Sequence, residues 1–181
     1  MSGKQTVSVR ILTERYGFPF PFPMPFSVPD DDDGDEEEPL ADEPSDSDAS
    51  DLETASGDPE PERSEFFAEG RLVTTDDRVD VVYEESVLTG MEGSVTSIGF
   101  SRSDPSVVTM LRQGFVDTAF VFEAGKRHIC VYQTPFATFE LCVHALAVRN
   151  DLLTRGEIEL DYLTEIHGAR TERCKMKIFV E

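Results

Sequence analysis

The sequence predicts an all-β protein, a single antiparallel meander or barrel with one long insertion near its start. Short runs in which apolar and polar residues alternate with period two fill most of the 181-residue chain. Turn-forming clusters separate these runs about every 10 to 12 residues, a spacing typical of meanders and barrels. The length fits one domain.

The first strand is expected within residues 1–16, where Val7, Val9 and Ile11 alternate with polar residues. Residues 17–64 lack such alternation and begin with a Pro–Phe repeat. Proline at every second position excludes a helix and a central strand. We therefore expect residues 17–64 to be a Pro/Phe-rich and acidic low-complexity insertion, largely disordered, and residues 65–181 to form the rest of the barrel.

The acidic character of the chain is concentrated in that insertion. The net charge is −21, and the stretch from Asp30 to Glu62 holds 17 acidic residues and no lysine or arginine. The remainder carries 20 acids against 16 bases, as in an ordinary globular protein. Dense like charges with little to bury favour disorder. They also disfavour nucleic acid as a partner, because phosphates would be repelled.

The strands after the insertion follow one another closely. The clearest is "GEIELDYLTEIHG", where Ile158, Leu160 and Tyr162 share one face and acids share the other. We also expect a strand at Phe139–Val148, although a helical stripe is possible there, and a helical turn near Asp151–Thr154. The total is about eight to ten strands. Other strands are indicated by "FFAEGRLVT", "VDVVYEES", "GSVTSIGFS", "SVVTMLRQG", "VDTAFVFEAG", "RHICVYQTP" and "TERCKMKIFVE".

Several of these segments together resemble a known family. "YEESVLTGMEGSVTSIGFS", "VVTMLRQG", "FVFEAGKRHICVYQTPFATFELCV" and "GEIELDYLTEIHG" are similar to YwiB-like domains, small bacterial proteins of unknown function. The resemblance covers the first strand and Phe66–Glu181, and it leaves out the insertion. It implies a calycin-like (lipocalin-like) up-and-down β-barrel. It implies no established activity.

Polar residues on otherwise aliphatic strand faces are the candidate binding residues. A buried carboxylate or guanidinium is costly unless it is paired, so we expect Glu85 and Arg112 to be partners inside the barrel. Two interpretations remain open: a structural ion pair, or a pocket at the barrel mouth that orients a small polar or acidic ligand. The candidate residues are Glu85, Arg112, His128, Tyr132 and Tyr162.

A zinc site is a weaker alternative. His128 and Cys130 lie two apart on one strand, and Cys142 and His144 lie two apart on the next. A turn centred on Phe136 would place these pairs opposite each other, with ligands that suit zinc. A turn centred half a residue earlier would separate them. Because the spacing matches no known zinc pattern, we expect no metal.

The sequence favours a non-enzymatic binding protein. It lacks the phosphate-loop, dinucleotide, nucleophile-elbow and zinc-protease motifs, so we expect no cofactor. The ligand would be a small molecule or a short protein segment at the barrel mouth. In the alternative, a regulatory protein would engage a basic partner through its acidic insertion. No apolar leader or membrane span is visible, and a cytoplasmic location is expected. The oligomeric state stays open.

Overall fold

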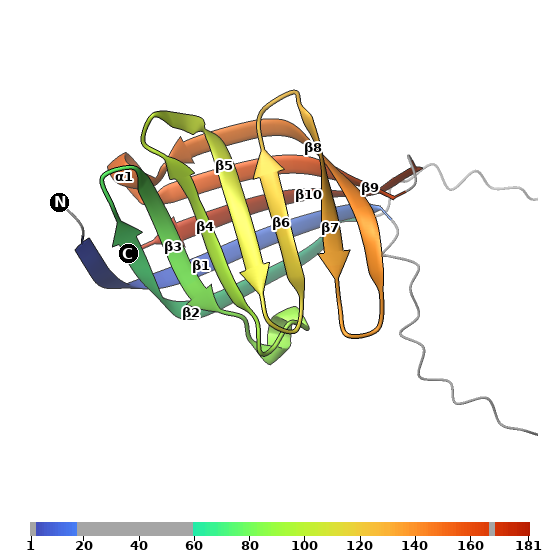
Figure 1. Ribbon diagram of the computed structural model, residues 1–181, viewed down its shortest axis with the longest axis horizontal. Helices are drawn as coiled ribbons and strands as arrows, with labels where there is room; N and C mark the ends of the chain where they lie inside the picture. Colours follow the sequence, from blue (N-terminus) through green and yellow to red (C-terminus); the bar gives the residue numbers. More distant parts are fainter. Residues whose placement is uncertain (1–2, 18–59, 167–168) are drawn as a thin grey trace, which may run out of the picture. The chain divides into compact units, whose positions relative to one another are not determined.

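Ten antiparallel strands close into a barrel in the computed structural model, which describes residues 3–17, 60–166 and 169–181 (Figure 1). Each strand pairs with the next along the chain, and β1 pairs with β10 to complete the circle. This confirms the predicted all-β up-and-down barrel. The strands are β1 (Gly3–Gly17), β2 (Glu62–Thr74), β3 (Arg78–Glu84), β4 (Val95–Ser101), β5 (Asp104–Gln113), β6 (Asp117–Phe122), β7 (Arg127–Gln133), β8 (Thr138–Asp151), β9 (Glu157–Ile166) and β10 (Ala169–Val180).

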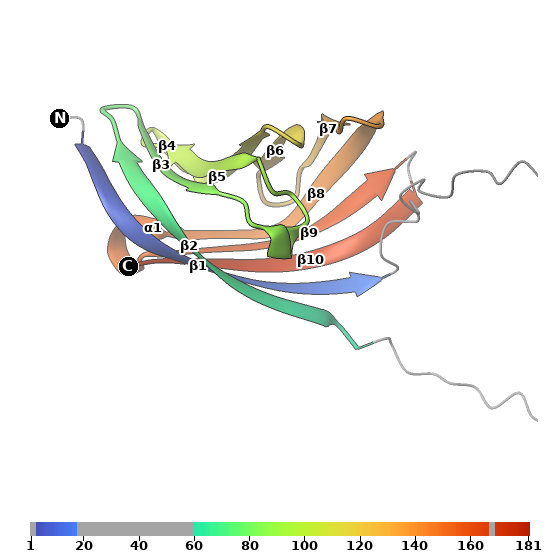
Figure 2. The same ribbon diagram turned by 90° about the horizontal axis from the view of Figure 1, so that it is seen from below.

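The barrel wall has two differently oriented parts. In Figures 1 and 2, β8, β9, β10 and β1 run side by side as long strands, and β3 to β7 cross them on the facing wall. Alternate residues of both parts point inward and form one core. The largest fully buried side chains are Phe122, Ile11, Ile98, Met110, Leu141, Ile158, Ile178, Val9, Val79, Val81, Val108 and Val143.

The barrel extends further into the expected insertion than its composition indicated. β1 includes Gly17, and β2 begins at Glu62, so both ends of the 17–64 range belong to the first hairpin. Cross-strand polar contacts explain this, since Arg63 pairs with Glu14 at 3.0 Å across the two strands. The rest of the insertion, residues 18–59, lies outside the described residues, and its disorder stays a prediction.

The ambiguous segment after residue 139 is a strand, as expected. β8 has a register shift between Ala145 and Ala147 in its pairing with β9. One inserted residue shifts the inward positions, so Leu141, Ala145 and Val148 all pack on the core although their spacing resembles that of a helix. The expected helical turn is α1 (Leu152–Arg155), and a 3₁₀ turn, η1 (Val87–Thr89), follows β3.

None of the helices in the described part of the chain has the length and apolar character needed to cross a membrane.

Candidate functional site

The inward rows of side chains change from apolar to polar along the barrel. In an up-and-down barrel, odd-numbered strands end and even-numbered strands begin at the same end. The buried polar side chains among the described residues all lie on these strand ends or directly beside them, and we call this the polar end. They are Thr13, Glu85, Ser94, Thr96, Arg112, Thr118 and Thr164.

The order of inward residues along each strand depends on the direction in which that strand runs. β3 runs Val79, Val81, Tyr83 and reaches Glu85 just beyond its end, whereas β6 runs in the opposite direction from Thr118 to Phe122. The opposite end of the barrel is consequently an apolar plug, and polar chemistry is confined to one mouth. The change from apolar to polar inward residues can be followed in the sequence once the strand directions are known.

An ion pair lies at the centre of the polar end. Arg112 Nη2 is 3.1 Å from Glu85 Oε1, and the two side chains are 9% and 1% exposed. Arg112 Nε donates to the same carboxylate oxygen at 3.2 Å and to Thr96 Oγ1 at 3.1 Å. The Thr96 hydroxyl also donates to Glu85 Oε1. The predicted pairing of Glu85 with Arg112 is therefore confirmed.

The ladder of β3, β4 and β5 places these groups together. Arg112 stands opposite Thr96, and Thr96 stands opposite Tyr83. The chain then leaves β3, and the Glu85 amide donates to the Ser94 carbonyl at 2.9 Å, which holds Glu85 beside the start of β4. Three neighbouring strands thus supply one side chain each to a buried hydrogen-bonded group.

The carboxylate is satisfied on one oxygen only. Glu85 Oε1 accepts hydrogen bonds from Thr96 and from Arg112 Nε and lies in the ion pair with Arg112 Nη2, whereas Glu85 Oε2 is buried without a hydrogen-bond partner. A buried acceptor without a donor costs about 1 to 3 kcal/mol, and more when it is charged. At the polar end, Glu85 Oε2 can therefore accept a hydrogen bond from a further donor.

The charge of Arg112 acts on three tyrosines of the core. Burial raises the pKa of Tyr83, Tyr132 and Tyr162, and the negative charge of Glu85 raises that of Tyr83 further. The positive charge of Arg112 lowers the pKa of all three, an effect smaller than that of burial. These phenols stay protonated at neutral pH and act as hydrogen-bonding groups, not as nucleophiles.

A second ion pair borders the polar end. Arg15 Nε lies 3.4 Å from Glu172 Oε1, with the arginine half exposed and the glutamate largely covered. Burial raises the pKa of Glu172, and Arg15 partly offsets this effect. The positive charge of Arg15 also lowers the pKa of Tyr132, against the larger effect of burial. The polar end thus carries one buried and one partly exposed ion pair.

His128 does not join the other predicted site residues. It lies at the start of β7, whereas Tyr132 lies near the end of that strand, about 13 Å further on for four extended residues. Its Nε2 is 3.5 Å from Glu123 Oε2 beside the turn that follows β6. The structure thus joins Glu85 and Arg112, whereas the ring of Tyr132 stacks on Phe139 and the ring of Tyr162 contacts Phe122. His128 lies elsewhere.

The four residues of the zinc alternative lie on opposite faces of the sheet. In the ladder between β7 and β8, Cys130 stands opposite buried Leu141, while Cys142 stands opposite Ile129, which is 74% exposed. The turn is centred between Pro135 and Phe136, since Gln133 pairs with Thr138. Compared with a turn centred on Phe136, this turn shifts the pairing by one residue. Cys142 and His144 therefore face away from Cys130 and His128.

Sequence reasoning missed the threonines and Ser94 of the polar end. Thr96 and Thr118 occupy the polar ends of inward rows in β4 and β6, but threonine is also common in ordinary strands. The position of Thr96 and Thr118 as the first inward residue after a turn was the available signal. The burial of these threonines beside charged groups depends on closure of the barrel.

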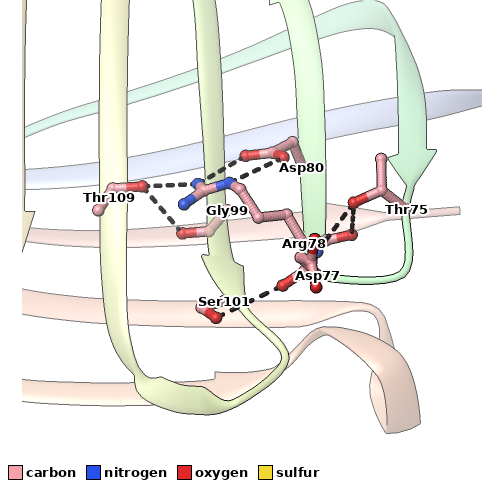
Figure 3. A network of polar contacts seen from close by, with 7 residues as sticks. All are labelled: Thr75, Asp77, Arg78, Asp80, Gly99, Ser101 and Thr109. Carbon is pink, nitrogen blue, oxygen red and sulfur yellow. Dashed lines mark hydrogen bonds and ion pairs between the residues drawn. The ribbon is translucent and has the colours of Figure 1, made fainter.

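A hollow on the outer face of β3, β4 and β5 is a separate feature. Figure 3 shows Arg78 donating to both carboxylate oxygens of Asp80 and to Thr109, which donates in turn to the Gly99 carbonyl. Gly99 makes room for this network, because a Cβ there would strike the Val79 carbonyl and Asp80. Its charges satisfy each other, so its role is structural. The hollow has a volume of 470 Å³ and is lined by Val73, Arg78, Asp80, Val82, Ser97, Thr109 and Leu111.

The barrel resembles one of known structure. The crystal structure of the ywiB protein from Bacillus subtilis superposes with a TM-score of 0.59 at 14% identity, covering 98% of this chain and 93% of that chain. At this identity the likeness concerns the fold. No curated protein matches the chain.

A family model supports the same assignment. The model of a domain of unknown function, DUF1934, matches residues 51–178, which include β2 to β9 and most of β10. The match confirms the resemblance seen in the sequence to YwiB-like domains. The chain therefore belongs to the DUF1934 family of domains of unknown function.

Proposed function

We propose that this domain is a non-enzymatic binding protein whose polar end takes a small polar molecule. The observation that carries the proposal is the Glu85 carboxylate, which accepts two hydrogen bonds on Oε1 and none on its buried Oε2. A ligand that donates a hydrogen bond to Oε2 would remove this deficit. Hydrogen bonds to charged groups contribute about 1.5 to 3 kcal/mol each, enough to select such a ligand.

The charges around the site favour a ligand without net charge. Glu85 and Arg112 neutralise each other, so an anion would compete with Glu85 for the guanidinium and leave a buried carboxylate unpaired. A hydroxyl or amide group supplies a donor without that cost. The aromatic rings of Tyr132 and Tyr162 would cover the apolar part of such a ligand.

The side chains at this end favour binding over catalysis. Burial raises the pKa of the Cys174 thiol, and a hydrogen bond from Tyr162 only partly offsets the rise. Burial also keeps Tyr83, Tyr132 and Tyr162 protonated. A nucleophile or general base needs the opposite pKa shift, toward an ionised form at neutral pH.

The proposal is tested by amide NMR titration with a set of small neutral molecules that carry hydroxyl or amide groups. Binding should shift the amide signals of Thr96, Arg112 and Tyr132. Glu85→Gln should weaken binding about tenfold or more, because the charged acceptor is lost. Glu84→Gln, on the exposed neighbouring position, is the matched control and should leave binding unchanged.

Thermal melting of both variants accompanies the titration, so that unfolding is not mistaken for lost binding. Binding that persists unchanged in folded Glu85→Gln would contradict the proposal. The proposal would also be contradicted if no molecule of the set shifted the amide signals of the polar end at millimolar concentration.

A further inference from the structure

Exposed apolar side chains gather on three loops at the polar end. The loops that follow β3, β5 and β7 all leave the barrel at this end, and Figure 1 shows them along the lower edge of the wall that these strands form. On these loops Val87 is 69% exposed and Leu88 is 85% exposed. Phe115 is 36% exposed and Phe136 is 56% exposed. We call these four residues the apolar collar.

The three loops that carry the collar are joined to one another. The Val116 amide of the loop after β5 donates to Ser94 Oγ of the loop after β3 at 3.0 Å, and both residues are buried. The rings of Phe115 and Phe136 meet edge to face, with their centroids 6.3 Å apart, and so connect the loop after β5 to the loop after β7. The collar is therefore one continuous rim of the barrel.

The collar adjoins the buried ion pair. Val87 follows Glu85 by two residues, and Phe115 follows Arg112 by three residues. Each pair of Cα atoms is therefore separated by no more than about 11 Å, the reach of an extended chain of that length. A molecule that donates a hydrogen bond to Glu85 Oε2 can consequently extend an apolar part across the collar.

The charges of these loops indicate the kind of polar group that binds there. The charged residues within 85–94, 113–117 and 133–138 are Glu85, Glu92 and Asp117, all of them acidic. An anionic group would be repelled by these carboxylates and would compete with Glu85 for Arg112. A hydroxyl or amide group can donate to Glu85 Oε2 without either cost.

We infer that the ligand of the polar end is an amphiphile, with an uncharged hydroxyl or amide head and an alkyl tail. The head donates to Glu85 Oε2, and the tail leaves the mouth across the collar, where it covers Leu88 and Phe115. Apolar side chains exposed together on adjacent loops have the properties of such a contact surface. The inference rests on the proposed function and adds to it the tail and the residues that bind the tail.

The test compares butanamide with octanamide in amide NMR titrations of the full chain. The two molecules share a head and differ by four methylene groups, and each fully buried methylene strengthens binding about fourfold. Because the collar covers the tail on one side only, octanamide should bind about tenfold more tightly than butanamide. Octanoate, which has the same number of carbons and an anionic head, should bind about tenfold more weakly than octanamide.

Variants separate the tail from the head. Leu88→Ser and Phe115→Ser should each reduce the preference for octanamide about threefold or more and leave the affinity for butanamide unchanged. Glu85→Gln should weaken the binding of both amides. Ile129→Ser, at a position 74% exposed on the outer face of β7, is the matched control and should change neither affinity. Because Leu88 is 85% exposed, its replacement leaves the core intact.

The outcomes distinguish this inference from the proposed function. Equal affinity for the two amides would overturn the inference and leave the proposed function standing, whereas binding of neither amide would contradict both. A preference for octanamide that persists in Leu88→Ser and in Phe115→Ser would also overturn the inference. Sedimentation of the chain with phosphatidylcholine vesicles, abolished by Leu88→Ser and without binding of octanamide, would assign the collar to a membrane surface instead.

Discussion

Arg112→Leu is the most informative single change, because it removes one half of a buried ion pair. In the native barrel the Glu85 side chain is 1% exposed, and Arg112 contacts its Oε1 through a hydrogen bond from Nε and an ion pair with Nη2. Leucine fills much of the space but leaves the carboxylate with Thr96 as its remaining donor. Removing one partner of a buried pair costs about 3 to 5 kcal/mol, since the other charge stays buried without compensation.

This loss is a large share of the stability of a small domain, which is about 5 to 15 kcal/mol. It corresponds to a decrease of about 150- to 5000-fold in the ratio of folded to unfolded protein. The melting temperature should fall by about 6 to 20 °C for a chain of this size.

Urea unfolding followed by circular dichroism measures the effect in Arg112→Leu, Glu85→Gln and the double variant. The double variant should be more stable than Arg112→Leu alone, because it no longer buries a charge. Arg149→Leu is the control, since its ion pair with Asp151, at 2.7 Å, is 51% exposed on the arginine side. It should cost less than about 1 kcal/mol. An equally small loss in Arg112→Leu would refute the reasoning.

Three other changes test the fold. Replacing residues 18–59 with a short glycine–serine turn should preserve the β signal in circular dichroism, because the hairpin ladder closes outside them, and a collapsed spectrum would contradict this. Gly99→Ala should cost about 1 to 3 kcal/mol in urea unfolding, because its Cβ would strike the Val79 carbonyl, and an unchanged midpoint would count against that crowding. Burial raises the pKa of Tyr162 above the unfolded value of about 10. Its contribution to stability is therefore complete below pH about 10 and is lost as the pH rises through the folded pKa. Tyr162→Phe should thus flatten the decline in urea midpoint above about pH 10, and parallel declines would contradict this.

The sequence by itself determined the strand content, the inward faces and the pairing of two charges. Alternation with period two is a local property, because a half-buried strand must place apolar residues on one face. Glu85 and Arg112 could be matched because each occupies an inward position among aliphatic residues, where an isolated charge is not tolerated. The β8 bulge shows the limit of this reasoning, since one inserted residue made a strand resemble a helix.

Only the tertiary structure decided which of these faces meet, and at which end of the barrel. Pairing across a turn changes by one residue when the turn centre moves by half a residue, and each such step exchanges the two faces of a strand. That step separated Cys142 from Cys130, and the direction of β7 separated His128 from the polar end. The path of the turn after β6 likewise depends on its bonds with Ala145, twenty residues further along the chain from Gly125. Such contacts are set by the balance of many non-local interactions when the barrel closes, and no local pattern in the sequence encodes that balance.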